Sequence, residues 1–322
     1  MEKERVTIQD LASIIGTSPG TISRALNDKD GVGEELRARI KAVAKEMGYT
    51  PRRQHPKEVM LVFPLAGVGL GPYTSGLAVI QESLARQNCV AINGYERDPK
   101  SQVLIMESRN LAAAIYFCCN PNEEVIQVAD KVALPLVLIH RESPLPHISS
   151  FVSDDFHGGY IATTHLLEQG RHRVAFLGPR KDYSPRLRWL GYCKAMEEQG
   201  ATPIYYDPSY LNRPQELIRD LQARGVNGIF TWDDDTAERL MSVLLYHSIQ
   251  IPKDIAVVGY NAMPPKEDGQ LPALTSVYWP IDQVCQWAMD YIAQCLVPKE
   301  GLCPIKVKLT PRLIVRSSSV TT

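Results

Sequence analysis

The 322-residue sequence has no apolar run long enough to cross a bilayer, and its first residues, MEKERVT, are charged rather than typical of a signal peptide. We therefore expect a cytoplasmic protein without a membrane partner. The seven cysteines include no C-x-x-C pair and show no metal-ligand spacing with the histidines. This pattern predicts plain, reduced thiols and no metal site.

A strong net charge is also missing. The formal net charge is −1, and the first 58 residues hold eleven Lys and Arg against nine Asp and Glu, an excess of only two. This balance gives no broad basic field that would attract nucleic acid. Affinity for phosphates must therefore come from the placement of individual side chains, and we expect any DNA binding to depend on dimerisation and on salt.

The motifs of common enzyme and nucleotide sites are absent as well. Residues 66–73, AGVGLGPY, are rich in glycine, but their spacing fits neither a Walker motif nor a dinucleotide fingerprint. There is no G-x-S-x-G elbow and no set of nucleophile, base and orienting group. The acidic run 233–235 together with His140 is the one candidate for acid–base work. We expect a binding protein rather than an enzyme, and no cofactor.

Residues 6–26, VTIQDLASIIGTSPGTISRAL, predict two short helices joined by a tight turn. Thr7 and Asp10 have the spacing of a capping box at the start of the first helix. Gly16 stands where a left-handed residue ends that helix. Ser18 is a natural cap for the second helix, and a proline follows it at the favoured first position.

A third amphipathic segment, residues 34–47, provides the apolar face that two helices this short need. Three helices in this order are typical of a helix-turn-helix unit. An ordinary helical hairpin is the alternative. The tight turn, the Ser-Pro start and the outward Thr, Ser and Arg side chains favour DNA binding.

The segment VTIQDLASIIGTSPGTISRALNDKDGVGEELRARIKAVAKEMGYTP, residues 6–51, resembles the DNA-binding head of the LacI/GalR family of bacterial repressors. The resemblance implies a transcriptional regulator that binds a near-palindromic operator in double-stranded DNA as a homodimer. Its recognition helix, residues 19–26, would enter the major groove, with Arg24 as the main candidate for a base or phosphate contact. The residues expected to contact DNA are Thr7, Ser18, Pro19, Gly20, Thr21, Ser23, Arg24, Asn27, Arg52 and Arg53.

Residues 50–58, TPRRQHPKE, contain two prolines and predict a linker. In the resembled family this region continues into a hinge helix that wedges a leucine into the minor groove. The equivalent segment here is shorter and has no leucine, which argues against such a wedge. One alternative to an operator-binding repressor is therefore a sugar-binding sensor whose head binds DNA weakly or not at all. A two-lobed carbohydrate-active enzyme is a weaker alternative.

After residue 58, short apolar runs alternate with amphipathic segments. Apolar strands that alternate with helices are typical of parallel sheets covered on both faces, and there are enough units for two such sheets. The predicted strands are 59–64, 89–93, 113–118, 135–140, 173–178, 228–232 and 255–260, and the predicted helices are 74–87, 102–110, 123–132, 157–169, 186–199, 214–224, 236–247 and 281–296.

The resemblance implies that the two sheets form the lobes of a periplasmic-binding-protein-like sensor with a ligand cleft between them. The expected fold class is an N-terminal all-α helix-turn-helix head followed by two α/β lobes with parallel sheets. The predicted divisions are a DNA-binding domain at 1–49, a linker at 50–58 and an effector-binding domain at 59–322, with lobe 1 at about 59–152 and 281–300 and lobe 2 at about 153–280 and 304–322.

Ligands of open parallel sheets lie at the carboxyl ends of strands, so side chains just after the predicted strands are candidates for an effector site. RLRWLGY, residues 186–192, resembles the arginine-bearing effector motif of the family and implies that Arg188 contacts the ligand. WDDD, residues 232–235, resembles the family's A-N-D signature. The predicted effector-binding residues are Tyr73, His140, Arg141, Arg188, Asp233, Asp234, Asn261 and Trp279.

The charges near these residues give a hint about the effector. Four cations lie within residues 180–188, and His140 and Arg141 are expected opposite them, which favours an anionic effector such as a sugar phosphate or a sugar acid. Asp233 and Asp234 favour recognition of sugar hydroxyls instead. We expect a sugar or a sugar-derived effector, with the anionic classes slightly ahead.

Overall fold

The computed structural model describes residues 6–26, 29–49, 56–64, 72–264, 270–296 and 303–320. The chain divides into two compact units, Met1–His55 and Pro56–Thr322, which we call the head and the body. Residues 50–55 of the predicted linker lie outside the described residues. The other end of that prediction is wrong, because strand β1 (Lys57–Phe63) already begins at Lys57 and pairs there with its neighbour.

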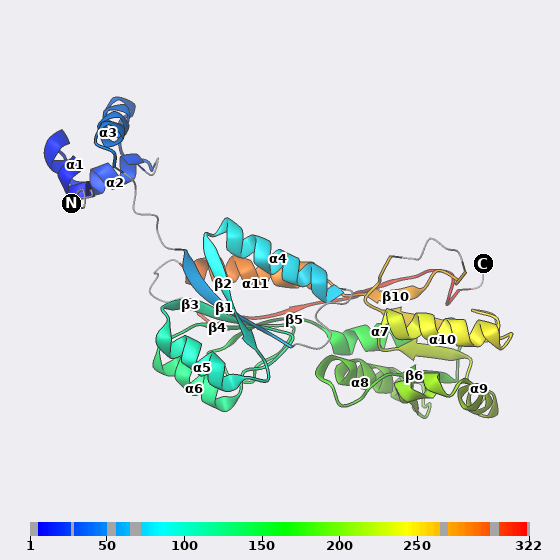
Figure 1. The fold of residues 1–322 in the computed structure, drawn as a ribbon. Helices are drawn as coiled ribbons and strands as arrows, with labels where there is room; N and C mark the ends of the chain where they lie inside the picture. Colours follow the sequence, from blue (N-terminus) through cyan, green and yellow to red (C-terminus); the bar gives the residue numbers. More distant parts are fainter. Residues whose placement is uncertain are drawn as a thin grey trace. The chain divides into compact units, whose positions relative to one another are not determined.

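The head consists of the helices α1 (Ile8–Ile15), α2 (Pro19–Leu26) and α3 (Glu34–Glu46), as Figure 1 shows. The predicted capping box starts α1. The Asp10 amide donates to Thr7 Oγ1 at 3.2 Å, and the Thr7 amide donates to the Asp10 carboxylate at 2.8 Å. These bonds satisfy backbone donors that an α-helix leaves open at its N-terminus.

Two residues shape the turn between α1 and α2. Gly16 has a φ of 75°, a left-handed conformation that suits glycine because it has no Cβ. The Thr21 amide donates to Ser18 Oγ at 3.1 Å, which confirms the predicted cap of α2. The apolar faces of the three helices then close one core, whose buried residues are Leu11, Ala12, Ile15, Ile22, Ala25, Ile40 and Ala44.

The body has two lobes, each built on a six-stranded sheet. In lobe 1 the strand order is β11-β5-β4-β3-β1-β2, and all neighbouring strands are parallel. Helices α4 and α11 cover one face and α5 and α6 cover the other (Figure 1). The further elements of this lobe are α4 (Pro72–Arg86), β2 (Cys89–Tyr95), α5 (Pro99–Ser108), β3 (Leu111–Phe117), α6 (Glu123–Lys131), β4 (Leu136–Ile139), β5 (Ser149–Ser153), α11 (Ile281–Cys295) and β11 (Lys306–Leu309).

In lobe 2 the strand order is β12-β10-β9-β8-β6-β7. Only β12 runs antiparallel to its neighbour among these strands. Helices α7 and α8 pack on one face, and α9 and α10 pack on the other. The elements are α7 (Asp155–Glu168), β6 (Val174–Leu177), α8 (Tyr183–Glu198), β7 (Ile204–Tyr206), η1 (Pro208–Asn212), α9 (Pro214–Ala223), β8 (Gly228–Thr231), α10 (Asp234–Tyr246), β9 (Ala256–Tyr260), β10 (Thr275–Tyr278) and β12 (Arg312–Ile314).

The chain crosses between the lobes near its end. The assignment of residues 304–322 to lobe 2 is wrong for its first part, because β11 pairs with β5 of lobe 1 and only β12 pairs in lobe 2. Pro311 lies between these two strands. A proline cannot donate to a strand ladder, so it ends the pairing of β11 and allows the chain to change sheets.

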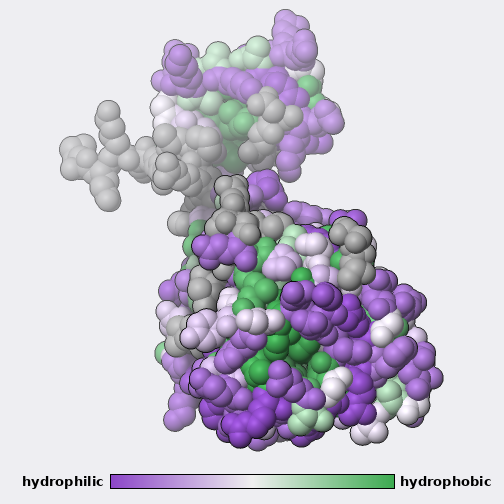
Figure 2. All heavy atoms as spheres, turned by 90° about the vertical axis from the view of Figure 1, so that its right-hand side faces the viewer, coloured by the Kyte–Doolittle hydropathy of each residue, from purple (hydrophilic) through white to green (hydrophobic). Residues whose placement is uncertain are grey.

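One cluster of buried apolar side chains continues from lobe 1 into lobe 2. It includes Ile115 and Phe117 of β3 as well as Phe230 of β8 and Val258 of β9. The face of the body in Figure 2 is mostly hydrophilic, with hydrophobic residues gathered in one central patch. Among the described ranges, no helix combines the length and apolar character that a membrane span requires.

Candidate functional site

A cavity of about 400 Å³ lies between the two lobes. In lobe 1, β1 lies between β2 and β3, and in lobe 2, β6 lies between β7 and β8. The connections on the two sides of such a strand diverge, which opens a crevice at the carboxyl ends, where open α/β sheets bind ligands. Pro64 and Cys118 reach the cavity from the lobe 1 crevice, and Trp232 and Ser184 reach it from the lobe 2 crevice.

The cavity is lined by aromatic and polar side chains. Tyr73 and Trp232 provide rings from opposite lobes. Its charged lining residues are Arg141, Glu96 and Asp182, so acids outnumber cations by one. A few placed polar groups among aromatic walls are the usual lining of a small-molecule site.

Two of the predicted effector-binding residues line this cavity, Tyr73 and Arg141. The Tyr73 ring packs edge-on against Trp279, with centroids 5.4 Å apart. Burial raises the pKa of Tyr73 to about 12, so its hydroxyl keeps its proton. The Arg141 guanidinium lies 5.0 Å from the Tyr183 ring of the other lobe and donates to the backbone oxygen of His140 at 2.7 Å.

Arg188, a predicted effector contact, is not among the residues that line the cavity. Its side chain is buried, its Nε donates to Asp155 Oδ1 at 2.9 Å, and its Nη1 donates to the Trp232 carbonyl at 2.5 Å. The guanidinium carbon lies 3.5 Å from the centre of the Tyr260 ring. Burial alone would lower the pKa of Arg188, but Asp155, Tyr260 and Tyr73 together outweigh burial and raise it. Nε and Nη1 of the guanidinium therefore already have protein partners.

Close helix packing brings these two charges together. Asp155 begins α7, and Arg188 lies in the middle of α8. A Cβ added at Gly159 would collide with the backbone of Arg188, and one added at Gly191 would collide with the backbone of Phe156. Because glycine lacks a Cβ, α7 and α8 can approach this closely.

His140 connects the lobes behind the cavity. It follows β4 of lobe 1, is buried, and its Nε2 lies 3.1 Å from Ser184 Oγ of lobe 2. The same nitrogen lies 3.9 Å from Asp155, and the imidazole packs 4.3 Å from the Trp279 ring. Burial lowers the pKa of His140 to about 3, so the imidazole is neutral at ordinary pH.

The two predicted acids of WDDD stabilise backbone instead of facing the cavity. Asp233 Oδ1 accepts the Thr236 amide at 2.8 Å and caps α10. Asp234 is buried, where it accepts Ser276 Oγ at 2.6 Å and the Met263 amide at 2.7 Å. Burial raises the pKa of Asp234 to about 6. Neither acid lines the cavity, so their prediction as effector contacts is not supported by this geometry.

Asn261 and Trp279 also lie outside the cavity lining. Asn261 has a φ of 116°, and its amide donates to the Val277 carbonyl at 2.9 Å. Trp279 is buried behind Tyr73 and His140, so it supports the cavity wall instead of forming it.

Sequence reasoning missed part of the cavity lining. Cys118 and Trp232 are the last residues of two predicted strands, so their position at the carboxyl ends was the available signal. Glu96 follows β2, which extends two residues beyond its predicted end at residue 93. Asp182, Tyr183, Ser184 and Pro185 enter because α8 begins three residues before its predicted start at 186.

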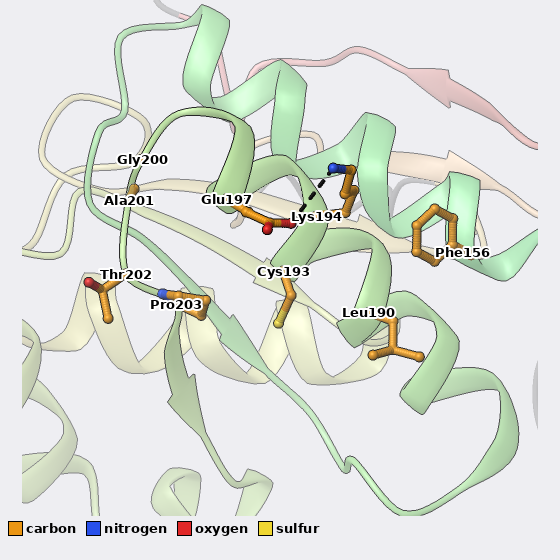
Figure 3. Close-up of a pocket in the computed structure, with 9 residues that line it drawn as sticks. All are labelled: Phe156, Leu190, Cys193, Lys194, Glu197, Gly200, Ala201, Thr202 and Pro203. Carbon is orange, nitrogen blue, oxygen red and sulfur yellow. Dashed lines mark ion pairs between the residues drawn. The ribbon is translucent and has the colours of Figure 1, made fainter.

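A separate hollow, on the outer side of α8, is shown with its lining residues in Figure 3. Phe156, Leu190 and Cys193 form its apolar part, and Lys194 pairs with Glu197 at 3.6 Å along its rim. Its remaining residues, 200–203, precede β7. The hollow therefore lies at the amino end of that strand, away from the edge where α/β sheets bind ligands.

The head presents part of the predicted DNA-binding surface to solvent. Arg24 on α2 is exposed, and its Nε lies 3.4 Å from the Gly20 carbonyl, one turn earlier. Ser18 and Thr21 share a hydrogen bond of 2.9 Å between their hydroxyls. Of the residues expected to contact DNA, Thr7, Ser18, Pro19, Gly20 and Arg24 are exposed, Thr21 and Ser23 are half-buried, and Asn27, Arg52 and Arg53 lie outside the described residues.

A three-helix head with an exposed second helix, joined to a two-lobed body with a cavity between its lobes, defines the class of ligand-responsive DNA-binding regulators. Residues 7–52 match the family described as bacterial regulatory proteins, lacI family, and residues 163–319 match the periplasmic binding protein-like domain. By sequence, the head is therefore similar to the bacterial regulatory proteins of the lacI family, and a relative that aligns over nearly the whole chain is named as an operon repressor. This confirms the resemblance, the fold class and the prediction of a regulator rather than an enzyme.

Relatives extend the comparison over most of the chain. The ribose operon repressor of Escherichia coli strain K12 is 26% identical, with 97% of this chain and 99% of the relative covered. The regulator RegA of Clostridium saccharobutylicum is 26% identical over 79% of this chain and 82% of the relative.

Two solved structures share the fold. The regulator CelR in complex with cellobiose aligns with a TM-score of 0.68 at 23% identity, covering 98% of this chain and 100% of that chain. The lac repressor dimer bound to operator and an anti-inducer aligns with a TM-score of 0.71 at 19% identity, covering 99% and 100%.

Proposed function

We propose that this protein is an operator-binding, homodimeric repressor of the LacI family whose DNA affinity is controlled by a neutral sugar in the cavity between the lobes. The observation that carries the proposal is the cavity itself, which opens at the diverging connections of both sheets. A ligand that touches both lobes binds differently when their separation changes, so it can shift the equilibrium between two lobe arrangements.

The charge of the cavity favours a neutral effector over the anionic classes. Arg188 is matched by Asp155, and the three other cations of the 180–188 stretch line a different cavity. The charged residues that line the effector cavity are therefore one cation, Arg141, and two acids, Glu96 and Asp182. An anion would meet two carboxylates there, whereas sugar hydroxyls can donate to them.

The aromatic rings support the same ligand class. Tyr73 and Trp232 offer flat apolar surfaces from opposite lobes. A sugar ring has an apolar face and an edge of hydroxyls, which suits rings combined with a few polar groups. The relatives include a protein named as a ribose operon repressor and a regulator solved with cellobiose.

The experiment is to measure the affinity of the full-length protein for fragments of the DNA upstream of its gene by fluorescence anisotropy, with and without sugars. We expect at least one neutral sugar to change the DNA affinity by about tenfold, a typical coupling between two sites. Glu96→Gln, at the cavity, should weaken the response to that sugar. Glu107→Gln, an exposed acid on α5 outside the cavity, is the matched control and should keep it.

Three results would contradict the proposal. A response to sugar phosphates or sugar acids alone would overturn the neutral effector. Equal responses of the two variants would place the effector elsewhere. Failure of the protein to bind any upstream fragment more tightly than unrelated DNA would favour the sensor with weak DNA binding.

A further inference from the structure

A second cavity, of about 700 Å³, lies in lobe 2 beside the effector cavity. We propose that it binds the phosphate group of a small phosphorylated molecule, at a site distinct from the cavity between the lobes. Its lining includes Arg180, Lys181 and Arg186, three of the four cations of residues 180–188, and none of the three lines the effector cavity. The volume is within the usual range for small-molecule sites, roughly 300–1,000 Å³.

The three cations have no carboxylate partner among the described residues. They lie within seven positions of the chain, and all three side chains are exposed. Several exposed cations elsewhere on the body do pair with acids, as Lys194 does with Glu198 at 3.4 Å and Arg213 does with Glu216 at 2.9 Å. Unpaired cations that converge on one hollow are the arrangement that recognises a phosphate.

Aromatic rings hold one of these cations in place. The Arg180 guanidinium carbon lies 3.7 Å from the centre of the Tyr205 ring and 5.3 Å from that of Trp189. The two rings are themselves in edge contact at 5.6 Å. The Arg180 guanidinium also hydrogen-bonds the Tyr205 side chain, and the other N–H groups in its plane can donate to phosphate oxygens.

The acids of this cavity do not cancel the cations. Asp207 accepts the Ser209 amide at 3.0 Å and lies 3.4 Å from the Tyr205 hydroxyl, so its carboxylate is already engaged. Asp182 is the other acid. Three cations against two acids leave an excess of one positive charge, the opposite sign to the effector cavity. The two cavities are thus suited to ligands of different charge.

The position of the cavity also favours a ligand. It lies at the carboxyl ends of β6 and β7, where the Gly178 amide donates to the Tyr206 carbonyl at 3.1 Å. Open α/β sheets bind ligands at this edge. Asp182 lines both cavities, so a phosphate in the second would lie close to a sugar in the first. A concave site of this size fits a small molecule better than a DNA backbone, which needs an extended surface.

The test is calorimetric titration of the full-length protein, in a buffer without phosphate, with ribose 5-phosphate, inorganic phosphate and ribose. The double variant Lys181→Gln/Arg186→Gln removes two cations from the cavity. Lys100→Gln/Lys131→Gln removes two exposed cations from lobe 1 and is the matched control. We expect the first variant to bind ribose 5-phosphate at least about tenfold more weakly than the wild type, since charge-assisted hydrogen bonds are lost. The control should bind within about twofold of the wild type.

The absence of saturable binding of both phosphate probes to the wild type would overturn the proposal. So would equal weakening in the two double variants, because that result would reflect net charge instead of a site. Binding of ribose 5-phosphate through its sugar would be recognised by an equal affinity for ribose. The neutral-sugar response that tests the effector cavity uses Glu96, which does not line this second cavity, so the two proposals can fail separately.

Discussion

The buried ion pair of Arg188 and Asp155 gives the RLRWLGY motif, residues 186–192, a structural role in this chain. The arginine is at the place that the resemblance assigns to effector contact, yet its Nε donates to Asp155 and its Nη1 donates to the Trp232 carbonyl. Removing one partner of a buried ion pair typically costs several kcal/mol, because the other charge stays buried without a partner. The pair therefore fixes the wall behind the cavity and leaves the cavity charge to Arg141, Glu96 and Asp182.

His140 predicts a pH dependence of stability. Its folded pKa is about 3, whereas an unperturbed histidine has a pKa of 6.5. Between these values the unfolded chain binds the proton first, so the free energy of unfolding should fall as the pH decreases below about 6.5. The contribution of His140 should approach about 1.4 kcal/mol for each pH unit. His140→Gln should lose this contribution, which urea unfolding at pH 7, 6 and 5 would measure.

His172→Gln is the matched control, because His172 is exposed on the surface. It should follow the pH profile of the wild type. A profile of His140→Gln that is equally steep below pH 6.5 would contradict the assignment. Asp234, with a folded pKa of about 6, acts in the opposite direction, since it stabilises the folded protein as the pH falls through that value. The comparison must therefore be made between variant and wild type.

At the scale of elements, helix α2 is stabilised by the turn that precedes it, by its N-cap and by the packing of its buried face. Gly16 turns the chain before it, and Ser18 accepts the Thr21 amide at its start. Ile22 and Ala25 face the core, which leaves Arg24 exposed. The helix can therefore lie against another molecule without losing its own packing.

Arg24→Ala should weaken operator binding by about ten- to a hundredfold, since one good arginine contact to a base is worth roughly 1–3 kcal/mol. Anisotropy titrations at one fixed salt concentration would measure the change. Arg39→Ala, an exposed arginine on α3, is the control and should change the affinity by about threefold or less. An equal loss for both variants would indicate a general charge effect and would contradict the role of α2.

Elements with strong local patterns were predictable from sequence. The capping box of α1 and the apolar strands β1, β3 and β9 needed no distant information. Strand β5 was missed because its sequence, SSFVS, is mostly polar, although all five residues are buried. At Ser149, a group from far along the chain satisfies the buried hydroxyl, because the Ile305 amide donates to Ser149 Oγ. The pairing of Arg188 with Asp155 was also unpredictable, because it depends on how two different helices, α7 and α8, pack together.

At the scale of the whole molecule, the head and the body have separate cores. The four tryptophans all lie in the body, so tryptophan fluorescence reports on the body alone. Ile40→Ala, in the core of the head, should destabilise the head by about 2–5 kcal/mol without moving the urea midpoint of tryptophan fluorescence. Ile229→Ala, an equally buried residue of β8, should lower that midpoint.

Far-UV circular dichroism of the same samples would follow the loss of head helices. A tryptophan midpoint that moves with Ile40→Ala would mean that the two units unfold together. Two separate tryptophan transitions in the wild type would contradict the single cluster of buried side chains that links the lobes.

The chain passes between the lobes at three places, from β5 to α7, from β10 to α11 and from β11 to β12. Each passage is short, with two residues between β11 and β12. Three short connections side by side resist twisting and sliding of one lobe relative to the other. Hinge bending is the relative motion that they permit, so a bound ligand would change mainly the angle between the lobes.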